Sequence, residues 1–436
     1  MPARTVADHL NVLRESLKTT SPYTCGVHPV RAEDLTLYYK TGNDTARFIE
    51  FSKAPEAQLL KLVAACQPAT FGFDQKEVLD ETYRKAVKMD IDKFSASLDI
   101  AASGILKAIS PDILDGQKGG DEKALRAELY KLNVYGPGSF FKAHKDTPRS
   151  DDMIGSLVIV YPTAHEGGAL TLSHGKNTWA FDSAAELAAH GQSSESKPAV
   201  AYIAFFSDVT HAVEEVRSGS RVTLTYNLYL EDHTADHPAS APERACETAL
   251  RALLVDPAFF PDGGLLAFSL THQYPIPARA ERSTLEQVLQ MLKGSDARIR
   301  TVAERVGLST VVRFVYESED RLFSEEDGND VLVDHVLDLE ELNTEYDDVR
   351  AAVEDAGKVL SDFRVGRKKR GHVEDDNASD SETTAVHWVT DRDRTSQNQV
   401  DSAYVFYGNE ASIGHVYGNA ALFVSIPSVG EGVRRG

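Results

Sequence analysis

Residues 139–146 have the sequence SFFKAHKD, an aromatic, strand-like run in which a histidine and an aspartate stand two positions apart. Side chains alternate between the two faces of a strand. One face of this run is therefore expected to carry four side chains: Phe140, Lys142, His144 and Asp146. An imidazole and a carboxylate that share a face can both bind one metal ion. The run thus predicts part of a metal site inside a β-rich fold.

A third metal ligand is expected from a later strand. The apolar run AVAYIAFF and the turn residues Ser207 and Asp208 precede His211, which opens the run HAVEEV. Two histidines and one carboxylate on one side of a metal, with the other positions open, form the facial triad of non-haem Fe(II) oxygenases. We therefore expect His144, Asp146 and His211 to be metal ligands and catalytic residues.

A basic residue lies ten positions after His211, in the strand-like run SRVTLTYNLYL. Alternation places Arg221 and Thr223 on one face, together with Thr225 and Asn227. A guanidinium inside a barrel is costly unless it meets an anion. A dicarboxylate cosubstrate supplies that anion when its keto-acid end chelates the metal and its distal carboxylate pairs with the planar fork of Arg221.

Around this run the chain divides into three regions, which together predict an α+β fold. Residues 126–232 hold six strand-length runs rich in Val, Ile, Tyr, Phe and Thr, typical of an antiparallel barrel or a double-sheet jelly roll. Residues 1–125 are expected to form a hairpin and a helical layer that packs on this core. Residues 233–436 mix helical and strand patterns. Within them, residues 365–382 combine dense charge with almost no apolar content, which predicts a disordered insertion.

Local patterns predict individual elements of the two outer regions. The first region is expected to hold a hairpin at 35–51 and helices from Pro55, over 80–94 and over 97–109, the last ending at Ser110–Pro111. The third is expected to hold helices over 241–254, 284–293 and 296–306 and strands over 263–270 and 309–318.

Composition narrows the class of protein. The chain has 436 residues, and its 67 acidic residues outnumber 46 basic ones, for a formal charge of −21. This charge argues against nucleic acid as a partner. Three cysteines are too few for a disulfide framework and indicate a reducing compartment. No apolar window is long enough for a signal peptide or a membrane span, so we expect no membrane partner and a cytoplasmic or nuclear location.

Three stretches of the middle region together resemble one enzyme family: NVYGPGSFFKAHKD, LVIVYPTAHEGGALTL and AFFSDVTHAVEEVRSGSRVTLTYNL. They are similar to the 2-oxoglutarate/Fe(II)-dependent dioxygenases, in particular to the prolyl 4-hydroxylase-like branch and its large, mostly fungal members. The resemblance covers roughly residues 126–232. It implies a double-stranded β-helix (jelly-roll) core, with Fe(II) as the metal, 2-oxoglutarate and O2 as cosubstrates, and ascorbate as a further reductant that the family permits.

The resemblance also implies a role for each matching residue. His144, Asp146 and His211 match the iron ligands of the family. Arg221 and Thr223 match the pair that binds the distal carboxylate of 2-oxoglutarate, and Tyr135 stands where the family often has a tyrosine that hydrogen-bonds the cosubstrate: all three are expected to bind the cosubstrate. Prolyl 4-hydroxylases proper commonly carry lysine in place of Arg221, which weakens proline as the implied substrate.

The expected activity is hydroxylation of a C–H bond in a protein, a prolyl residue included, or in a small molecule, with release of succinate and CO2. Desaturation and demethylation begin with the same hydrogen abstraction and stay open. Halogenation is disfavoured because related halogenases lack the carboxylate that Asp146 provides. The alternative is a non-catalytic, metal-binding β-barrel scaffold or a regulatory protein that acts through its C-terminal region.

Three neighbouring features are expected to be structural. Gly167–Gly168 form a tight connection or a plain turn, and no chemistry is assigned to them. Asp208 is expected to cap its turn, with orientation of His211 as the alternative. His174 is expected to be a structural histidine.

Overall fold

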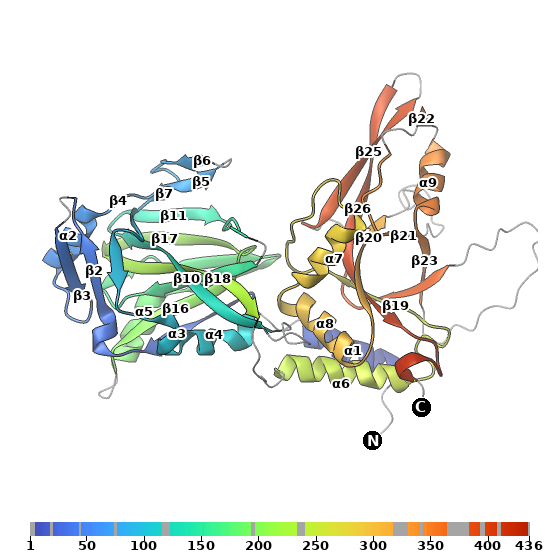
Figure 1. Ribbon diagram of the computed structural model, residues 1–436, viewed down its shortest axis with the longest axis horizontal. Helices are drawn as coiled ribbons and strands as arrows, with labels where there is room; N and C mark the ends of the chain where they lie inside the picture. The colour runs from blue at the N-terminus through green and yellow to red at the C-terminus, as the bar shows by residue number, and fades with distance from the viewer. Residues whose placement is uncertain are drawn as a thin grey trace, which may run out of the picture. The chain divides into compact units, whose positions relative to one another are not determined.

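The computed structural model describes residues 5–17, 21–42, 45–73, 76–115, 123–150, 152–192, 197–232, 240–316, 330–339, 343–344, 346–363, 383–392, 397–407 and 411–434. The chain forms two compact units (Figure 1). The two-sheet unit comprises Thr20–Leu114 and Asp121–Ala235, and the C-terminal unit comprises Met1–Thr19, Asp115–Gly120 and Asp236–Gly436. The predicted disordered insertion at 365–382 lies outside the described residues.

The two-sheet unit is built on two large antiparallel sheets. In order across it, the seven-stranded sheet contains β1 (Tyr23–Pro29), β16 (Ala199–Phe206), β12 (Met153–Val160), β18 (Arg221–Asp232), β10 (Lys123–Tyr135), β8 (Val87–Asp90) and β4 (Gln67–Pro68). The six-stranded sheet contains β15 (Asn177–Phe181), β14 (Leu170–His174), β17 (Thr210–Gly219), β11 (Ser139–His144) and β7 (Arg84–Lys85), and β13 (His165–Gly167) also pairs with β17. The expected β-rich core in a fold of mixed α and β content is therefore present.

Alternation along the central strands separates an apolar face from a polar one. Leu132 of β10 and Leu224 of β18 are register partners with no exposed surface. Helix α4 (Ile105–Ile113) contacts β10 and buries an isoleucine stripe at four-residue spacing. The neighbouring positions Asn133 and Thr223 carry polar side chains and point the other way. The apolar face thus packs on helices, and the polar face remains for a site.

Several local predictions for the first region are confirmed. The hairpin forms as β2 (Thr36–Lys40) and β3 (Ala46–Glu50), with β9 (Phe94–Ala96) added beside β2. The helix after Pro55 is α2 (Glu56–Ala65), and a second small hairpin is formed by β5 (Phe71–Phe73) and β6 (Lys76–Val78).

Two helix predictions need correction. Residues 80–94 are not helical, because β7 pairs with β11 and β8 pairs with β10, and this long-range pairing overrides the local pattern. The predicted helix over 97–109 is split into α3 (Ile100–Ser103) and α4 at Gly104, whose φ is +87°. Helix α4 also runs past Ser110–Pro111 to Ile113. Pro111 has no backbone N–H, so the carbonyl of Lys107 lacks its helical hydrogen bond. Because Lys107 is exposed, water can bind that carbonyl instead.

The C-terminal unit has one mixed eight-stranded sheet flanked by helices. In order across it, the strands are β19 (Gly264–Ser269), β24 (Thr384–Trp388), β23 (Lys358–Asp362), β21 (Val331–Val333), β20 (Thr310–Tyr316), β26 (Ala411–Ile426), β25 (Gln399–Tyr407) and β22 (Asn343–Thr344). The helices are α1 (Val6–Leu17), α6 (Ala241–Val255), α7 (Arg282–Gln290), α8 (Gly294–Arg305) and α9 (Tyr346–Asp355). The helices and strands predicted here from local patterns are confirmed to within two or three residues at each end.

The N-terminal helix does not join the layer expected over residues 1–125. Helix α1 belongs to the C-terminal unit, where its buried residues Val6, Leu10 and Leu13 share a hydrophobic core with Leu253 of α6. This apolar stripe has the spacing of one helix face, and α6 presents a matching stripe. The domain boundaries of the structure therefore differ from the three consecutive regions 1–125, 126–232 and 233–436.

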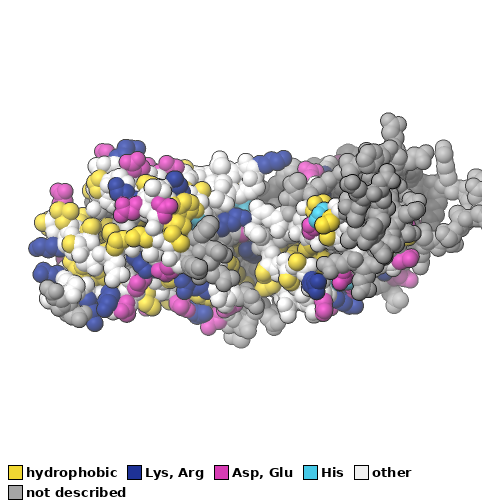
Figure 2. Space-filling model, turned by 90° about the horizontal axis from the view of Figure 1, so that it is seen from above, with side chains coloured by type: hydrophobic (Ala, Val, Ile, Leu, Met, Phe, Trp, Pro, Cys, Tyr) yellow, Lys and Arg dark blue, Asp and Glu magenta, His cyan; other side chains and the backbone are white. Residues whose placement is uncertain are grey.

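The structure also bears on the surface charge, the cysteines and a possible membrane span. Acidic and basic side chains are interspersed over the face of the two-sheet unit that Figure 2 shows. The three cysteines, Cys25, Cys66 and Cys246, are free thiols. Among the described residues, no helix is long and apolar enough to cross a bilayer.

A buried ion pair joins two segments of the C-terminal unit. The guanidinium of Arg298, on α8, is fully buried and donates to the Asp115 carboxylate and to the carbonyl oxygen of Ser16. Ser240 donates to the other oxygen of Asp115 at 3.0 Å. The pair thus ties α8 to the end of α1.

We expect Arg298→Met to destabilise the C-terminal unit by about 3–5 kcal/mol, because it leaves the Asp115 carboxylate buried without its cation. Arg251→Met is the control, since Arg251 is 56% exposed and pairs with Glu247 one helical turn away; its cost is expected to be at most about 0.5 kcal/mol. Denaturant unfolding measures both. Equal stability losses would contradict the assignment of Arg298 as a stabilising link.

Candidate metal and cosubstrate site

The structure brings the three predicted metal ligands together. His144 ends β11 and is the register partner of His211 on β17, with ring centroids 4.2 Å apart. Asp146 follows two residues after β11, and its Oδ1 lies 3.7 Å from Nε2 of His211. One possible ligand atom from each residue lies within 4.8 Å of the other two. The arrangement is that of a three-residue metal site.

A β-bulge, and not simple alternation, sets the direction of His144. The β11–β17 register shifts between Phe141 and His144, so that three steps along β11 match two steps along β17. Phe141 therefore lies on the side of His144, and their rings stack with centroids 3.6 Å apart. The expectation that Phe140 shares the face of His144 is wrong, because the bulge inserts one extra residue between them.

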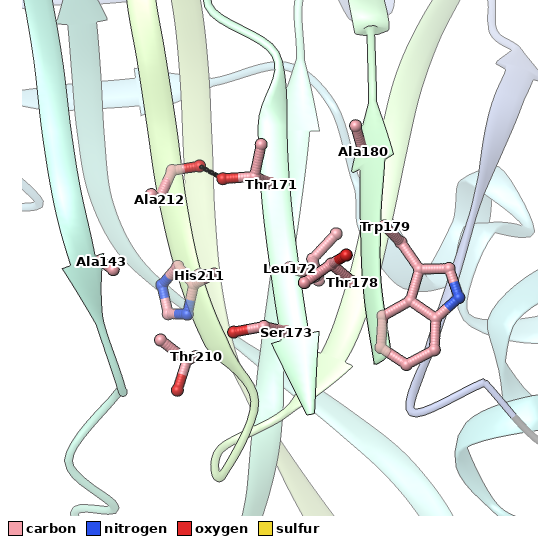
Figure 3. A pocket seen from close by; sticks show the side chains of 10 residues that line it. All are labelled: Ala143, Thr171, Leu172, Ser173, Thr178, Trp179, Ala180, Thr210, His211 and Ala212. Atoms are coloured by element: carbon pink, nitrogen blue, oxygen red, sulfur yellow. Dashed lines mark hydrogen bonds between the residues drawn. The ribbon is translucent and has the colours of Figure 1, made fainter. Parts of the chain in front are cut away.

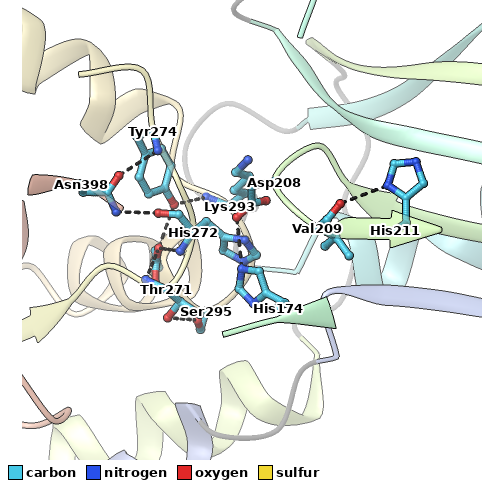
Figure 4. Close-up of polar contacts among 11 residues, drawn as sticks. His174, Asp208, Val209, His211, Thr271, His272, Tyr274, Lys293, Ser295 and Asn398 are labelled. Atoms are coloured by element: carbon cyan, nitrogen blue, oxygen red, sulfur yellow. Dashed lines mark hydrogen bonds and ion pairs between the residues drawn. The ribbon is translucent and has the colours of Figure 1, made fainter. Parts of the chain in front are cut away.

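Backbone carbonyls hold both imidazoles. Nδ1 of His144 donates to the carbonyl of Lys142 at 2.9 Å, and Nδ1 of His211 donates to the carbonyl of Val209 at 3.1 Å (Figure 4). A carbonyl only accepts, so each Nδ1 carries the proton and each Nε2 offers a lone pair. Burial, followed by the charge of His211, lowers the pKa of His144 to about 3. The ring is thus neutral at physiological pH and free to ligate.

Asp146 is oriented by a serine on the facing sheet. Ser156 of β12 is buried and donates to Oδ2 of Asp146 at 2.5 Å, which leaves Oδ1 toward the histidines. Within the described part of the chain, no fourth His, Cys, Asp or Glu joins this group. Two imidazole nitrogens and one carboxylate oxygen, with the remaining positions open, suit Fe(II).

Arg221 lies buried at the start of β18. It is only 1% exposed, and its Nε and Nη2 have no hydrogen-bond partner among the described residues. Its register partner is Tyr135 of β10, whose ring centroid lies 5.7 Å from the guanidinium carbon. Burial lowers the pKa of Arg221, against the opposing effects of Tyr135 and Asp182. Two free donors on a buried cation form a binding group for an anion.

Thr223 lies beside this guanidinium on the polar face of β18. It is 1% exposed, and its hydroxyl donates to the carbonyl of Asn133 over a long 3.4 Å. Arg221, Thr223 and Tyr135 thus line one buried patch.

Gly168 makes room for Arg221, a role that the sequence analysis missed. A Cβ at Gly168 would lie 2.9 Å from Cδ of Arg221 and 2.8 Å from Cγ2 of Val216, and its φ is +70°. Both the space and the backbone conformation therefore require glycine. Gly167 is equally constrained, because a Cβ there would lie 2.3 Å from the carbonyl oxygen of Glu215.

Arg84 was also missed. It lies on β7, is buried, and stacks over Phe141 with its guanidinium carbon 4.4 Å from the ring centroid. It donates to the side chain of Asn133 and to the carbonyl of Thr70, each at 2.7 Å. Because Phe141 also stacks on His144, Arg84 helps to hold the ring of His144 in place through Phe141. Only the pairing of β7 with β11 brings it there.

A hollow of about 460 Å³ borders His211 (Figure 3). Most of its lining consists of small side chains from four strands, and the full lining is Ala143, Thr171, Leu172, Ser173, Thr178, Trp179, Ala180, Thr210, His211 and Ala212. Thr210 and Ala212 flank His211 on β17 and point to the opposite face. The hollow therefore opens mainly on the outer face of the six-stranded sheet.

The two residues of uncertain role pair with each other. Nε2 of His174 lies 3.2 Å from Oδ2 of Asp208, and both side chains are largely buried. The alternative role of Asp208, orientation of His211, is not seen, because Nδ1 of His211 donates to the carbonyl of Val209. This contact supports a structural role for His174.

A family match covers the site. Residues 130–229 match the family model described as the 2OG-Fe(II) oxygenase superfamily, and this segment includes both histidines, Asp146 and Arg221. The match indicates a 2OG-Fe(II) oxygenase domain over these residues. The family uses Fe(II), 2-oxoglutarate and O2, and the donor set described above fits this metal. Among curated proteins, no relative matches the chain.

Solved structures similar to this chain include prolyl hydroxylases. A prolyl 4-hydroxylase from Pseudomonas putida is 18% identical, with 50% of this chain and 98% of that chain covered and a TM-score of 0.29. A prolyl hydroxylase from Trichoplax adhaerens, in complex with a hypoxia-inducible factor peptide, is 15% identical, with 52% and 94% covered and a TM-score of 0.29. At these values the likenesses do not transfer a substrate to this chain.

We expect Gly168→Ala to destabilise the two-sheet unit by about 2–4 kcal/mol, since it adds overpacking against Arg221 and Val216 to the strain of a left-handed alanine. Gly175→Ala is the control, because Gly175 has φ +57° but nothing within 4 Å of an added Cβ; it should cost only about 1 kcal/mol. Denaturant unfolding of the two variants measures the difference. Equal losses would show that glycine is needed at position 168 only for its positive φ and not for the space beside Arg221.

Proposed function

We propose that this chain is a 2-oxoglutarate- and Fe(II)-dependent dioxygenase that hydroxylates a C–H bond of a protein, a prolyl residue included, or of a small molecule. The balanced reaction is R–H + 2-oxoglutarate + O2 → R–OH + succinate + CO2. The convergence of His144, Asp146 and His211 inside the segment that matches the oxygenase family carries this proposal. We also infer that the two large sheets form the double-stranded β-helix of that family.

His144, Asp146 and His211 would hold Fe(II) through Nε2, Oδ1 and Nε2. When bound, the iron supplies the activation of O2 and the oxidation of the substrate. The carbonyls of Lys142 and Val209 hold the Nδ1 proton and orient the two imidazoles. Asp146 supplies the third ligand atom, and this favours hydroxylation over halogenation, which needs that position for a halide.

Arg221 would bind the distal carboxylate of 2-oxoglutarate through Nε and Nη2, the two nitrogens without a partner among the described residues. Thr223 follows Arg221 by two residues on β18, and Tyr135 is its register partner on β10, so both share its polar face. Their hydroxyl groups are suited to hydrogen-bond the same carboxylate. Ascorbate would restore iron oxidised in turnovers without substrate.

The first test is succinate formation from 2-oxoglutarate by the purified, Fe(II)-loaded full chain. We expect slow turnover even without the primary substrate, and a loss of at least about 100-fold in Asp146→Ala, because loss of a ligand costs more than loss of a residue that only orients one. Thermal unfolding of the variant checks that it folds. A wild-type protein that binds Fe(II) and 2-oxoglutarate but forms no succinate would favour a non-catalytic metal-binding scaffold.

The second test separates cosubstrate binding from metal binding. We expect Arg221→Ala to weaken 2-oxoglutarate binding by at least about tenfold, since a buried charged pair is typically worth about 2–5 kcal/mol. Metal affinity should stay nearly unchanged because Arg221 is no ligand. Arg221→Lys should recover part of the binding, since an ammonium keeps the charge and loses the fork. Calorimetry on the metal-loaded variants decides, and unchanged affinity in Arg221→Ala would refute this role.

A further inference from the structure

The seven-stranded sheet carries a polar row beside the metal-binding residues. Ser156 of β12, which donates to Asp146, is the register partner of Asn227 on β18. Two residues earlier on β18, Thr225 is the register partner of Lys131 on β10. Register partners point to the same face. Because neighbouring strands lie about 4.8 Å apart, β10 brings Lys131 to roughly 10 Å from the strand that supports Asp146.

A β-bulge turns Lys131 onto this face. The β10–β18 register shifts between Leu129 and Lys131, so Tyr130 is the extra residue. Leu129 lines a hollow with Leu106 of α4 and so lies on the helix-covered face. Simple alternation would place Lys131 there too, with its ammonium among apolar side chains. The bulge moves it to the polar face instead.

Lys131 is a largely buried lysine whose charge helps to lower the pKa of Glu77 but which has no ion pair of its own among the described residues. It is 8% exposed, and its Nζ lies 4.5 Å from the ring centroid of Tyr130. Among the described residues, no acceptor lies within hydrogen-bond distance of this ammonium and no carboxylate pairs with it. Arg149, three residues after Asp146, stacks on the same Tyr130 ring at 4.2 Å. Two cations thus share one aromatic ring near the metal site.

The nearest acids belong to another lysine. Lys88 is also buried, and its ammonium lies 3.2 Å from Asp90 and 4.0 Å from Glu77. Asp90 is the register partner of Lys131, yet its carboxylate turns to Lys88. Lys131 thus has no ion pair of its own among the described residues, and its ammonium is suited to bind an anion that enters the barrel.

We propose that the substrate carries an acidic group, a carboxylate or a phosphate, that binds Lys131 while its reacting C–H bond lies at the metal. This inference rests on the proposed function. The carboxylates of 2-oxoglutarate do not serve here, because one binds the metal and the other binds Arg221. The facing sheet presents the apolar side chains of Phe141, Leu172 and Val213. A substrate with an acidic end and an apolar body matches both walls.

The test uses matched acidic and neutral probes with the Fe(II)-loaded full chain. The pairs are glutamate and glutamine, a glutamate-containing and a glutamine-containing pentapeptide, and O-phosphoserine and serine. We expect the acidic member of one pair to raise 2-oxoglutarate consumption above the basal rate and its neutral partner not to do so. The pair that responds identifies the source of the acidic group.

Variants then assign the effect to Lys131. Lys131→Met should raise the half-saturating concentration of the responding probe by at least about tenfold, and Lys131→Arg should keep most of the response because it keeps the charge. Lys107→Met is the matched control, since Lys107 is exposed on α4, on the other side of the sheet. It should change neither basal consumption nor the response.

Other outcomes overturn the inference. Equal responses to acidic and neutral probes, no response to any acidic probe, or a full response in Lys131→Met would each do so. A loss of 2-oxoglutarate affinity in Lys131→Met would assign the residue to the cosubstrate instead. If the wild type consumes no 2-oxoglutarate at all, the proposed function fails. Calorimetric titration of the same probes into Mn(II)-loaded protein with 2-oxoglutarate then decides the inference alone: acid-selective binding that requires Lys131 supports it, and its absence refutes it.

Discussion

The register between β11 and β17 is the constraint on which the site depends. It makes His144 and His211 direct partners, and it is held by the buried apolar pair Phe141 and Val213. A slip of one residue would turn every side chain of β11 to the opposite face. His144 would then leave His211, and Asp146 would lose its support from Ser156. The geometry of the metal site therefore follows from hydrophobic packing between two strands.

The same packing links the candidate metal ligands to Arg221 and its neighbours. Arg84 stacks on Phe141, which stacks on His144, and it also donates to the side chain of Asn133. The carbonyl of Asn133 accepts from Thr223, which lies next to Arg221 on the polar face. A buried guanidinium with these three contacts holds its neighbours in one arrangement. The two binding groups are thus parts of one packed layer.

The sequence could predict the ligand types and the strands that carry them, because the spacing of His144, Asp146 and His211 and the period of the strands are local. It could not predict what arises from pairing between distant segments. The bulge after Phe141 is visible only in the register with β17. The local pattern around Arg84 predicts a helix, and only the pairing of β7 with β11 makes this segment a strand. The space around Gly168 likewise depends on Arg221, far along the chain. The disagreement over α1 has the same origin, since its partner α6 is distant in sequence.

Besides Arg84, three buried cations near the site illustrate how charge is balanced inside a protein of net charge −21. Lys88 is paired with Asp90, so its charge is balanced within the protein and its role is structural. Arg221 has two unpartnered nitrogens among the described residues, and the cosubstrate supplies an anion for them under the proposed function. Among the described residues, Lys131 has an aromatic ring beside it but no acid within ion-pair distance. Because a bare charge is costly to bury, a fold that keeps such a group needs a reason to do so. For Lys131 the remaining molecule in the proposed reaction is the substrate, and we therefore infer an acidic group on it.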